Sequence, residues 1–175
     1  FGGGIYSADN SITIFSKCNL QNNSTDPNED YYTGYGGGLA IVDAISVRLA
    51  DCNITGNSAS AGGGFYGGRI GSLRISGNNF LNNSSYIGGG IYINDITTAD
   101  VNNSVISGNS ATFTPDYFDG AGGGIYCSTS DARIFDCTIN ENTASGSGGG
   151  IYIDTNSPLL FNCLITGNTA NSDGG

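Results

Sequence analysis

The chain has 175 residues, with 15 Asp and Glu against 5 Lys and Arg and no His, so its formal net charge is −10. This charge excludes the basic footprint of a nucleic-acid-binding protein and disfavours contact with an anionic membrane surface. No apolar run reaches the length of a transmembrane helix, and without His or a C-x-x-C pair the usual zinc ligands are missing.

Glycine triplets divide the chain into repeats. They begin at residues 2, 36, 62, 88, 122 and 148, and a final Gly pair begins at 174, so the spacings are 34, 26, 26, 34, 26 and 26 residues. The order 34-26-26 occurs twice, which makes residues 2–87 and 88–173 two copies of an 86-residue unit. A fixed period of this size is typical of stacked repeats. We therefore interpret residues 1–175 as one solenoid segment.

A short strand is predicted directly after each triplet. The first residue after the triplet is always apolar, and the second is Tyr in five of six repeats. Further strands are predicted at 12–15, 46–49, 72–75, 132–135 and 158–161, and in the segments that end each coil, such as "CNITGNSA" (52–59) and "CLITGNTA" (163–170). Alternating short strands without helical periodicity predict an all-β parallel solenoid of about six coils of 26 residues.

An asparagine stands at the same turn of every coil. The column consists of Asn23, Asn57, Asn83, Asn109, Asn142 and Asn168. At the strand spacing of about 4.8 Å, each side-chain amide can donate to one neighbouring coil and accept from the other. The column predicts a structural asparagine ladder. The same coil spacing explains the glycine triplets. A corner repeated at this spacing needs positive φ and has no room for Cβ atoms, and glycine meets both requirements.

The combination of "GGGIY" (2–6, 88–92, 122–126 and 148–152) with "NCLITGNTA" (162–170) resembles the right-handed parallel β-helix repeats of bacterial and archaeal surface proteins. It is similar to the GGA(I/L) and FxxN repeats of chlamydial polymorphic outer-membrane proteins. "FLNN" (80–83) matches the second half of that motif, and Ile or Leu replaces the Phe elsewhere. The resemblance implies a cell-surface or extracellular β-helix used as an adhesin, passenger domain or fibre. The same fold also carries pectin-lyase-like enzymes.

Coils one and four carry eight extra residues at the same corner, within 24–35 and 111–121. Both inserts contain Pro and end on an aligned aromatic pair. The pairs are Tyr31 and Tyr32 in the first insert, and Tyr117 and Phe118 in the second. Repeated inserts on one side of a solenoid often mark its binding face. We expect these aromatics to make contacts; the alternative is a tolerated surface loop.

The tyrosines that follow the triplets form a second candidate surface. They are Tyr6, Tyr66, Tyr92, Tyr126 and Tyr152, and they point outward if the preceding apolar residues point inward. Stacked rings can hold sugars or pack against a neighbouring fibre. The alternative is that they reflect the β propensity of Tyr and ring stacking between coils.

Charged residues form a column at one corner. Its members are Asp9, Asp43, Arg69 and Asp95, and coils five and six place Thr129 and Thr155 there. Carboxylates at this spacing suit calcium, but Arg69 between two of them favours a salt ladder. We therefore expect no metal and no cofactor.

The five cysteines are expected to be buried thiols. Cys18 and Cys52, and likewise Cys137 and Cys163, are predicted neighbours in adjacent coils, with Cys127 on another strand. In-register parallel geometry rarely suits the disulfide torsion, whereas a thiol packs well as a small apolar group.

Three N-x-S/T sequons are expected to be accessible to glycosylation where the source glycosylates: Asn22, Asn53 and Asn82.

Two functions remain open. The first is a non-enzymatic extracellular structural or adhesive protein that contacts copies of itself, end to end or side by side, with glycans as further partners and without nucleic acid or membrane insertion. The ends lack polar caps, so we expect a window of a longer solenoid or end-to-end stacking. The alternative is a pectin-lyase-like lyase or hydrolase that uses Arg69 and Arg74 near Asp43 and Asp95.

Overall fold

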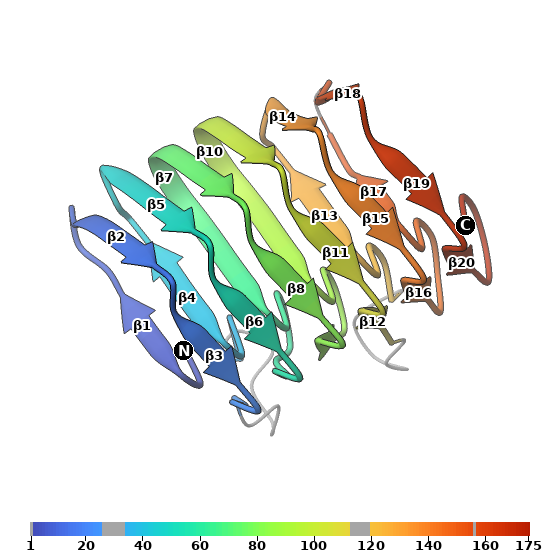
Figure 1. Ribbon diagram of the computed structural model, residues 1–175, viewed down its shortest axis with the longest axis horizontal. Helices are drawn as coiled ribbons and strands as arrows, with labels where there is room; N and C mark the ends of the chain where they lie inside the picture. Colours follow the sequence, from blue (N-terminus) through green and yellow to red (C-terminus); the bar gives the residue numbers. More distant parts are fainter. Residues whose placement is uncertain (1, 26–33, 113–119, 156) are drawn as a thin grey trace.

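The computed structural model describes residues 2–25, 34–112, 120–155 and 157–175. Every regular element in this part of the chain is a β-strand, and none of it forms a helix capable of spanning a membrane. The strands are stacked as successive coils, with the two termini at opposite ends of the stack (Figure 1). This arrangement confirms the predicted all-β parallel solenoid.

Three parallel sheets wind around the core. The ten-stranded sheet covers two faces, because β7 and β10 continue around the corner between them. Its first face contains β1 (Ile5–Ser7), β4 (Leu39–Val42), β7 (Phe65–Ser76), β10 (Ile91–Asn102), β13 (Ile125–Ser128) and β17 (Ile151–Ile153). Its second face contains β2 (Ile12–Ser16), β5 (Ser46–Ala50), the second parts of β7 and β10, β14 (Ala132–Phe135) and β18 (Leu159–Phe161).

The other two sheets complete each coil. The third face contains β3 (Asn19–Gln21), β6 (Asn53–Thr55), β8 (Asn79–Leu81), β11 (Val105–Ser107), β15 (Thr138–Asn140) and β19 (Leu164–Thr166). The fourth face contains the two-residue strands β9 (Ser84–Ser85), β12 (Ser110–Ala111), β16 (Thr143–Ala144) and β20 (Thr169–Ala170). The sequence predicts the first three faces but not the fourth, because two residues are too few to show an alternating pattern.

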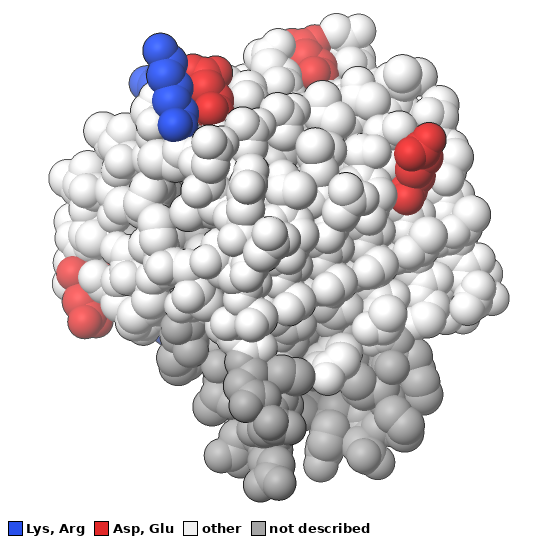
Figure 2. All heavy atoms as spheres, turned by 60° about the horizontal axis from the view of Figure 1, so that its bottom comes forward, with Lys and Arg blue, Asp and Glu red and all other residues white. Residues whose placement is uncertain are grey.

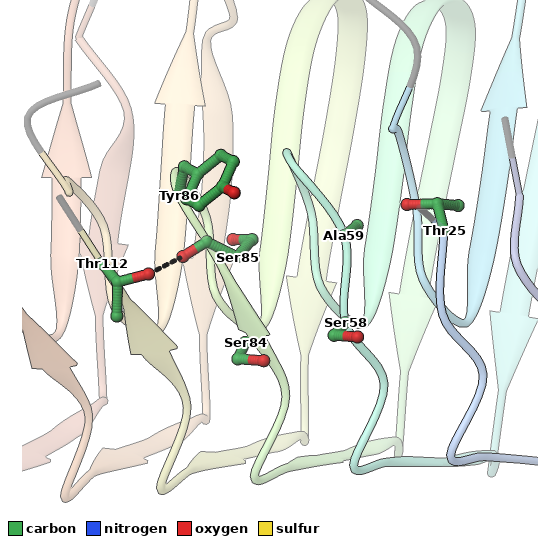
Figure 3. A pocket seen from close by; sticks show the side chains of 7 residues that line it. All are labelled: Thr25, Ser58, Ala59, Ser84, Ser85, Tyr86 and Thr112. Atoms are coloured by element: carbon green, nitrogen blue, oxygen red, sulfur yellow. Dashed lines mark hydrogen bonds between the residues drawn. The ribbon is translucent and has the colours of Figure 1, made fainter. Parts of the chain in front are cut away.

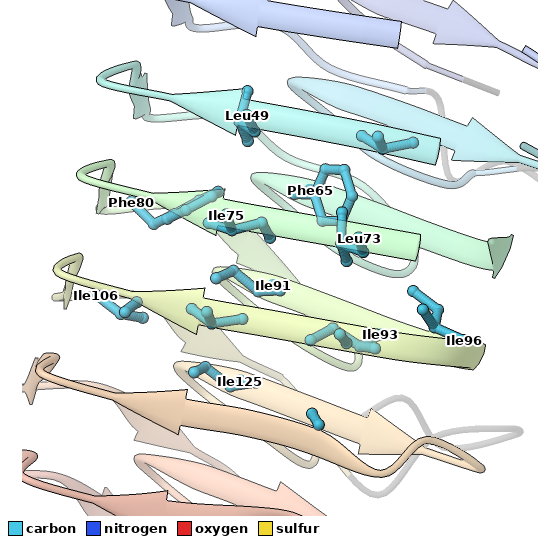
Figure 4. Close-up of a cluster of buried hydrophobic side chains, with 14 of the residues drawn as sticks. Leu49, Phe65, Leu73, Ile75, Phe80, Ile91, Ile93, Ile96, Ile106 and Ile125 are labelled. Carbon is cyan, nitrogen blue, oxygen red and sulfur yellow. The ribbon is translucent and has the colours of Figure 1, made fainter. Parts of the chain in front are cut away.

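The strands pair in register at equivalent repeat positions. Ile91, for example, pairs with Phe65 on one side and with Ile125 on the other. The same apolar positions therefore meet inside the stack, where Phe65, Phe80 and Ile91 are fully buried (Figure 4). Burial of these side chains is the main favourable contribution to folding.

Each coil bends at corners where one residue has a left-handed backbone. The charged column occupies one such corner, with φ values from 50° to 64° at Asp9, Asp43, Arg69, Asp95 and Thr129. Asp and Asn tolerate this conformation better than most residues, because their short polar side chains bond locally. The left-handed turn is therefore the first explanation for the Asp residues in this column.

The three glycines of a triplet are needed for different reasons, as coil four shows. Gly88 has φ +63°, whereas Gly89 and Gly90 do not have positive φ. A Cβ on Gly89 would lie 2.5 Å from the carbonyl oxygen of Ser110, and one on Gly90 would lie 3.1 Å from the amide of Asn109. The triplet therefore lets the first face pack directly on the backbone of the fourth face and on the asparagine ladder.

The predicted asparagine ladder is confirmed. In all five steps from Asn23 to Asn168, the Nδ2 of one Asn donates to the Oδ1 of the next at 2.9–3.0 Å. Asn83 shows the full pattern: its Oδ1 accepts from the backbone N–H and the Nδ2 of Asn57, and its Nδ2 also donates to the carbonyl of Ile54. Every hydrogen-bonding position of this buried amide is used.

Candidate functional site

The four aromatic residues predicted in the inserts, Tyr31, Tyr32, Tyr117 and Phe118, lie outside the described residues. The last described residues before the two inserts are Thr25 and Thr112, and both belong to the fourth-face corner. The N–H of Thr25 donates to the carbonyl of Ser58, and the N–H of Thr112 donates to that of Ser85. The contact role of the insert aromatics stays a prediction.

Four members of the tyrosine column, Tyr66, Tyr92, Tyr126 and Tyr152, form a continuous row of rings, but the column is less exposed than expected. Tyr66 is only 6% exposed and packs with Ala40, Val42 and Ala61 in a second apolar cluster outside the main core. Tyr6 is 48% exposed. Tyr92, Tyr126 and Tyr152 are half-buried. The side chains do point away from the main core, yet their neighbours cover much of each ring.

The rings contact one another along the stack. Centroid distances are 5.3 Å from Tyr66 to Tyr92, 4.8 Å from Tyr92 to Tyr126 and 4.9 Å from Tyr126 to Tyr152. Coil two has Ala40 at this position, but Tyr35, which precedes its triplet, stacks on Tyr66 at 4.5 Å. Tyr35 thus extends the file from outside the repeat column, which no sequence signal indicates. We call Tyr35, Tyr66, Tyr92, Tyr126 and Tyr152 the tyrosine file.

The phenols of Tyr66 and Tyr92 are neutral at ordinary pH. Burial raises the pKa of Tyr66 and of Tyr92 above the usual range of a phenol. A hydrogen bond with the side chain of Asn94 partly offsets this shift at Tyr66. At Tyr66 and Tyr92 the file therefore offers ring surface and neutral hydroxyls rather than charge.

The charged corner contains a two-contact ion pair. Arg69 Nε lies 2.6 Å from Asp43 Oδ1, and its Nη2 lies 2.8 Å from Asp43 Oδ2. This hydrogen bonding lowers the pKa of Asp43 and raises that of Arg69, with a smaller contribution to Arg69 from Asp95. The salt-ladder interpretation is confirmed for Asp43 and Arg69.

Arg74 does not join that corner, contrary to the four-residue cluster that the sequence suggested. It lies on the second face, where its Nη2 is 3.7 Å from Asp100 Oδ2. Arg133 binds the same carboxylate through two contacts of 2.7 and 2.8 Å. The reason is the corner at Arg69, which turns β7 so that residues five apart lie on different faces. The described ranges also contain no group of three or more His, Cys, Asp or Glu side chains that could hold a metal ion.

A hollow at the fourth-face corner was not predicted. It has a volume of about 160 Å³ and is shown in Figure 3. Its lining residues are Thr25, Ser58, Ala59, Ser84, Ser85, Tyr86 and Thr112. Ser58 and Ser84 stand at a repeated position after a ladder asparagine, but the residue type varies between coils at the positions of Thr25, Tyr86 and Thr112. Only the stacking of four coils therefore assembles the site.

Among the described residues, charged side chains are sparse on the side of the molecule drawn in Figure 2, where blue atoms lie beside one red group and the other red groups stand apart on a mostly uncharged surface. The described acidic side chains therefore do not form one continuous patch on this side.

A family model described as a right-handed beta helix region matches residues 1–174. The chain belongs to this family. The match confirms the right-handed parallel β-helix that the repeat resemblance implied. Comparison with curated proteins and with solved structures found no match. Because this fold occurs in enzymes and in non-enzymes, the function has to be argued from the sites.

The cysteines of the β-helix are all free thiols. Cys52, Cys127 and Cys137 are buried, whereas Cys18 and Cys163 are half-buried. The thiols of one column take part in hydrogen bonds between coils: Cys52 Sγ accepts from the N–H of Cys18 at 3.4 Å. Burial raises the pKa of Cys127 to about 12 and that of Cys137 to about 11.

We expect thiol alkylation at pH 8.5 to modify Cys18 and Cys163 first and to leave Cys127 unmodified until denaturant is added, because the thiolate is the reactive form. A thiol in the unfolded chain has its ordinary pKa of about 9.0. The stability that the protonated buried thiols contribute is therefore complete below pH 9 and is lost as the pH rises toward 12. Intact-mass counting measures the labelling. Equal labelling rates at Cys127 and Cys163 would contradict the burial.

The three predicted sequon asparagines are all exposed. Asn22 and Asn82 sit at left-handed corners with φ 55°. Asn53 belongs to an outer ladder that the sequence analysis missed: its Nδ2 donates to Asn19 Oδ1 at 2.9 Å, and its Oδ1 accepts from Asn79 at 2.8 Å. Glycosylation of Asn53 would have to break the hydrogen bond from its Nδ2 to Asn19. Asn22 and Asn82 are therefore the more accessible candidates.

Proposed function

We propose that this β-helix is a non-enzymatic structural or adhesive segment of an extracellular or cell-surface protein, such as a fibre, sheath or adhesin stalk. The observation that carries the proposal is the tyrosine file, a row of rings in mutual contact along one edge of the stack. Through it the segment contacts neighbouring copies of itself or another surface. The resemblance to surface-protein repeats supports the setting.

The file is well suited to binding because its rings are already ordered. Each ring is fixed by the next coil at 4.5–5.3 Å, so little side-chain entropy remains to be lost on contact. Aromatic rings with a hydroxyl offer both apolar and hydrogen-bonding contact. In-register strand pairing aligns Tyr66, Tyr92, Tyr126 and Tyr152, one ring in each coil.

The arginines offer less support for the lyase alternative. A lyase base has to lose its proton near the working pH. Instead, direct hydrogen bonds to the Asp43 carboxylate raise the pKa of Arg69. Its guanidinium group therefore acts as a fixed cation in an ion pair.

The proposal is tested by replacing two file residues together, Tyr126→Ala and Tyr152→Ala. Self-association is measured by sedimentation, and adhesion by retention on fixed cell surfaces. We expect binding to weaken about tenfold or more, which corresponds to about 1.4 kcal/mol. The matched control is Phe135→Ala, which removes a ring stacked on Phe161 at 4.9 Å on the second face and should leave binding unchanged.

Circular dichroism of each variant shows whether the β-helix is intact. Unchanged binding by a folded tyrosine variant would contradict the proposal. So would cleavage of a polyuronide by the wild type that is lost in Arg69→Ala, because this result would favour the lyase alternative.

A further inference from the structure

The hollow at the fourth-face corner lies between the positions where the two inserts begin. Thr25 and Thr112 bound it on opposite sides, and the two coils between them, which have no insert, supply its floor (Figure 3). The two inserts occur 86 residues apart, so the arrangement follows from the longer repeat. At about 160 Å³ the hollow is smaller than the usual ligand pocket of roughly 300–1,000 Å³ and has room for one small ring.

Thr25 carries an unsatisfied hydroxyl in this hollow. The residue is 9% exposed, and its Oγ1 is buried without a hydrogen-bond partner. Figure 3 shows the hydroxyl oxygen on the side that faces Ala59 and the rest of the lining. By contrast, the buried hydroxyl of Ser85, two coils away in the same register, donates to the carbonyl of Ile87 at 2.7 Å. An unpaired buried hydroxyl destabilises a folded protein, so its presence here points to an external partner.

The chemistry of the lining restricts that partner. None of the seven lining residues is charged, although the chain has a net charge of −10. The lining offers Ser and Thr hydroxyls together with the ring of Tyr86. A free hydroxyl can donate and accept, but those of Ser85 and Thr112 already donate to backbone carbonyls and can only accept from a ligand. A neutral molecule with several hydroxyls and an apolar ring face matches this set.

We propose that the hollow binds one neutral hexose unit and that the Thr25 hydroxyl is one of its hydrogen-bond partners. The hexose belongs to a glycan or is a free sugar, and both present the same ring chemistry. The biological setting of this site rests on the proposed adhesive function, for which it names a ligand class. The site itself is separate from the tyrosine file.

The experiment titrates the β-helix with glucose, galactose and mannose, each up to roughly 50 mM, and follows ligand-side magnetisation transfer by NMR. We expect one of them to bind with a Kd of about 1–10 mM, in the range of weak single-site contacts. Thr25→Val keeps the shape of the side chain and removes the hydroxyl. It should weaken binding at least tenfold while the thermal midpoint stays the same or rises.

The matched control is Thr143→Val, which removes an exposed hydroxyl from the equivalent strand β16 outside the hollow and should bind like the wild type. If Thr25→Val fails to fold, Ser84→Ala takes its place with the same expected loss. A neutral oligosaccharide that ends in the preferred hexose distinguishes the two sources: tighter binding than the free sugar indicates a glycan, and equal binding indicates the monosaccharide.

The proposal is overturned if no neutral hexose binds, if folded Thr25→Val binds like the wild type, or if galacturonate binds as well as the neutral sugars. The Tyr126→Ala and Tyr152→Ala variant should retain hexose binding. Loss of adhesion with intact sugar binding, or the reverse, shows which of the two proposals fails.

Discussion

Replacing Asn83 by Ala is expected to lower the free energy of unfolding by about 4 kcal/mol, because it leaves several buried polar groups without partners. The backbone N–H and the Nδ2 of Asn57 lose their shared acceptor, and the carbonyl of Ile54 loses a donor. Asn57 and Asn83 are fully buried, so water cannot replace these bonds. Each unsatisfied buried group costs about 1–3 kcal/mol.

Urea unfolding followed by circular dichroism measures this effect. The matched control is Asn79→Ala in the same coil, because Asn79 also donates its amide to the preceding coil, at 2.8 Å to Asn53, but on the exposed outer ladder. Its loss should cost no more than about 0.5 kcal/mol. Equal effects at the two positions would show that the inner ladder does not depend on burial.

Gly89→Ala is expected to destabilise the β-helix by about 3 kcal/mol or more. The new Cβ would lie 2.5 Å from the carbonyl oxygen of Ser110 and also against that of Gly123. Both obstacles are backbone atoms, so no side chain can rotate away. Gly89 does not have positive φ, so the expected cost is steric and not conformational.

The control for this variant is Gly167→Asn, measured by the same urea titration. Gly167 has φ +64°, and a Cβ added there would lie 3.8 Å from Glu141 Cγ, an ordinary van der Waals distance. Asn already occupies the equivalent corner at Asn22 and Asn82, so the change should stay within about 0.5 kcal/mol. A mild effect of Gly89→Ala would mean that the first face can move away from the fourth.

The sequence alone supported the strand positions, the parallel stacking and the identity of the ladder residues. These features repeat with the coil, so one chain supplies several copies of the same pattern. Asn57 by itself reads as a turn residue, whereas six asparagines at equivalent positions indicate a ladder. The register found between Ile91 and Phe65 follows from the same spacing.

Features that occur once could not be predicted in this way. Tyr35 joins the tyrosine file from outside its column, and Arg74 pairs with Asp100 because the corner at Arg69 turns the strand onto another face. The two-residue fourth face is too short to show alternation.

The sequence by itself therefore determined the β-helix, because every coil must place the same side chain over the same position of its neighbour. Only the tertiary structure decided where unrepeated residues meet, as Thr25 and Tyr86 do in the hollow. The physical reason is that stacking fixes the repeated contacts through spacing alone, whereas contacts between unlike positions depend on how each corner turns.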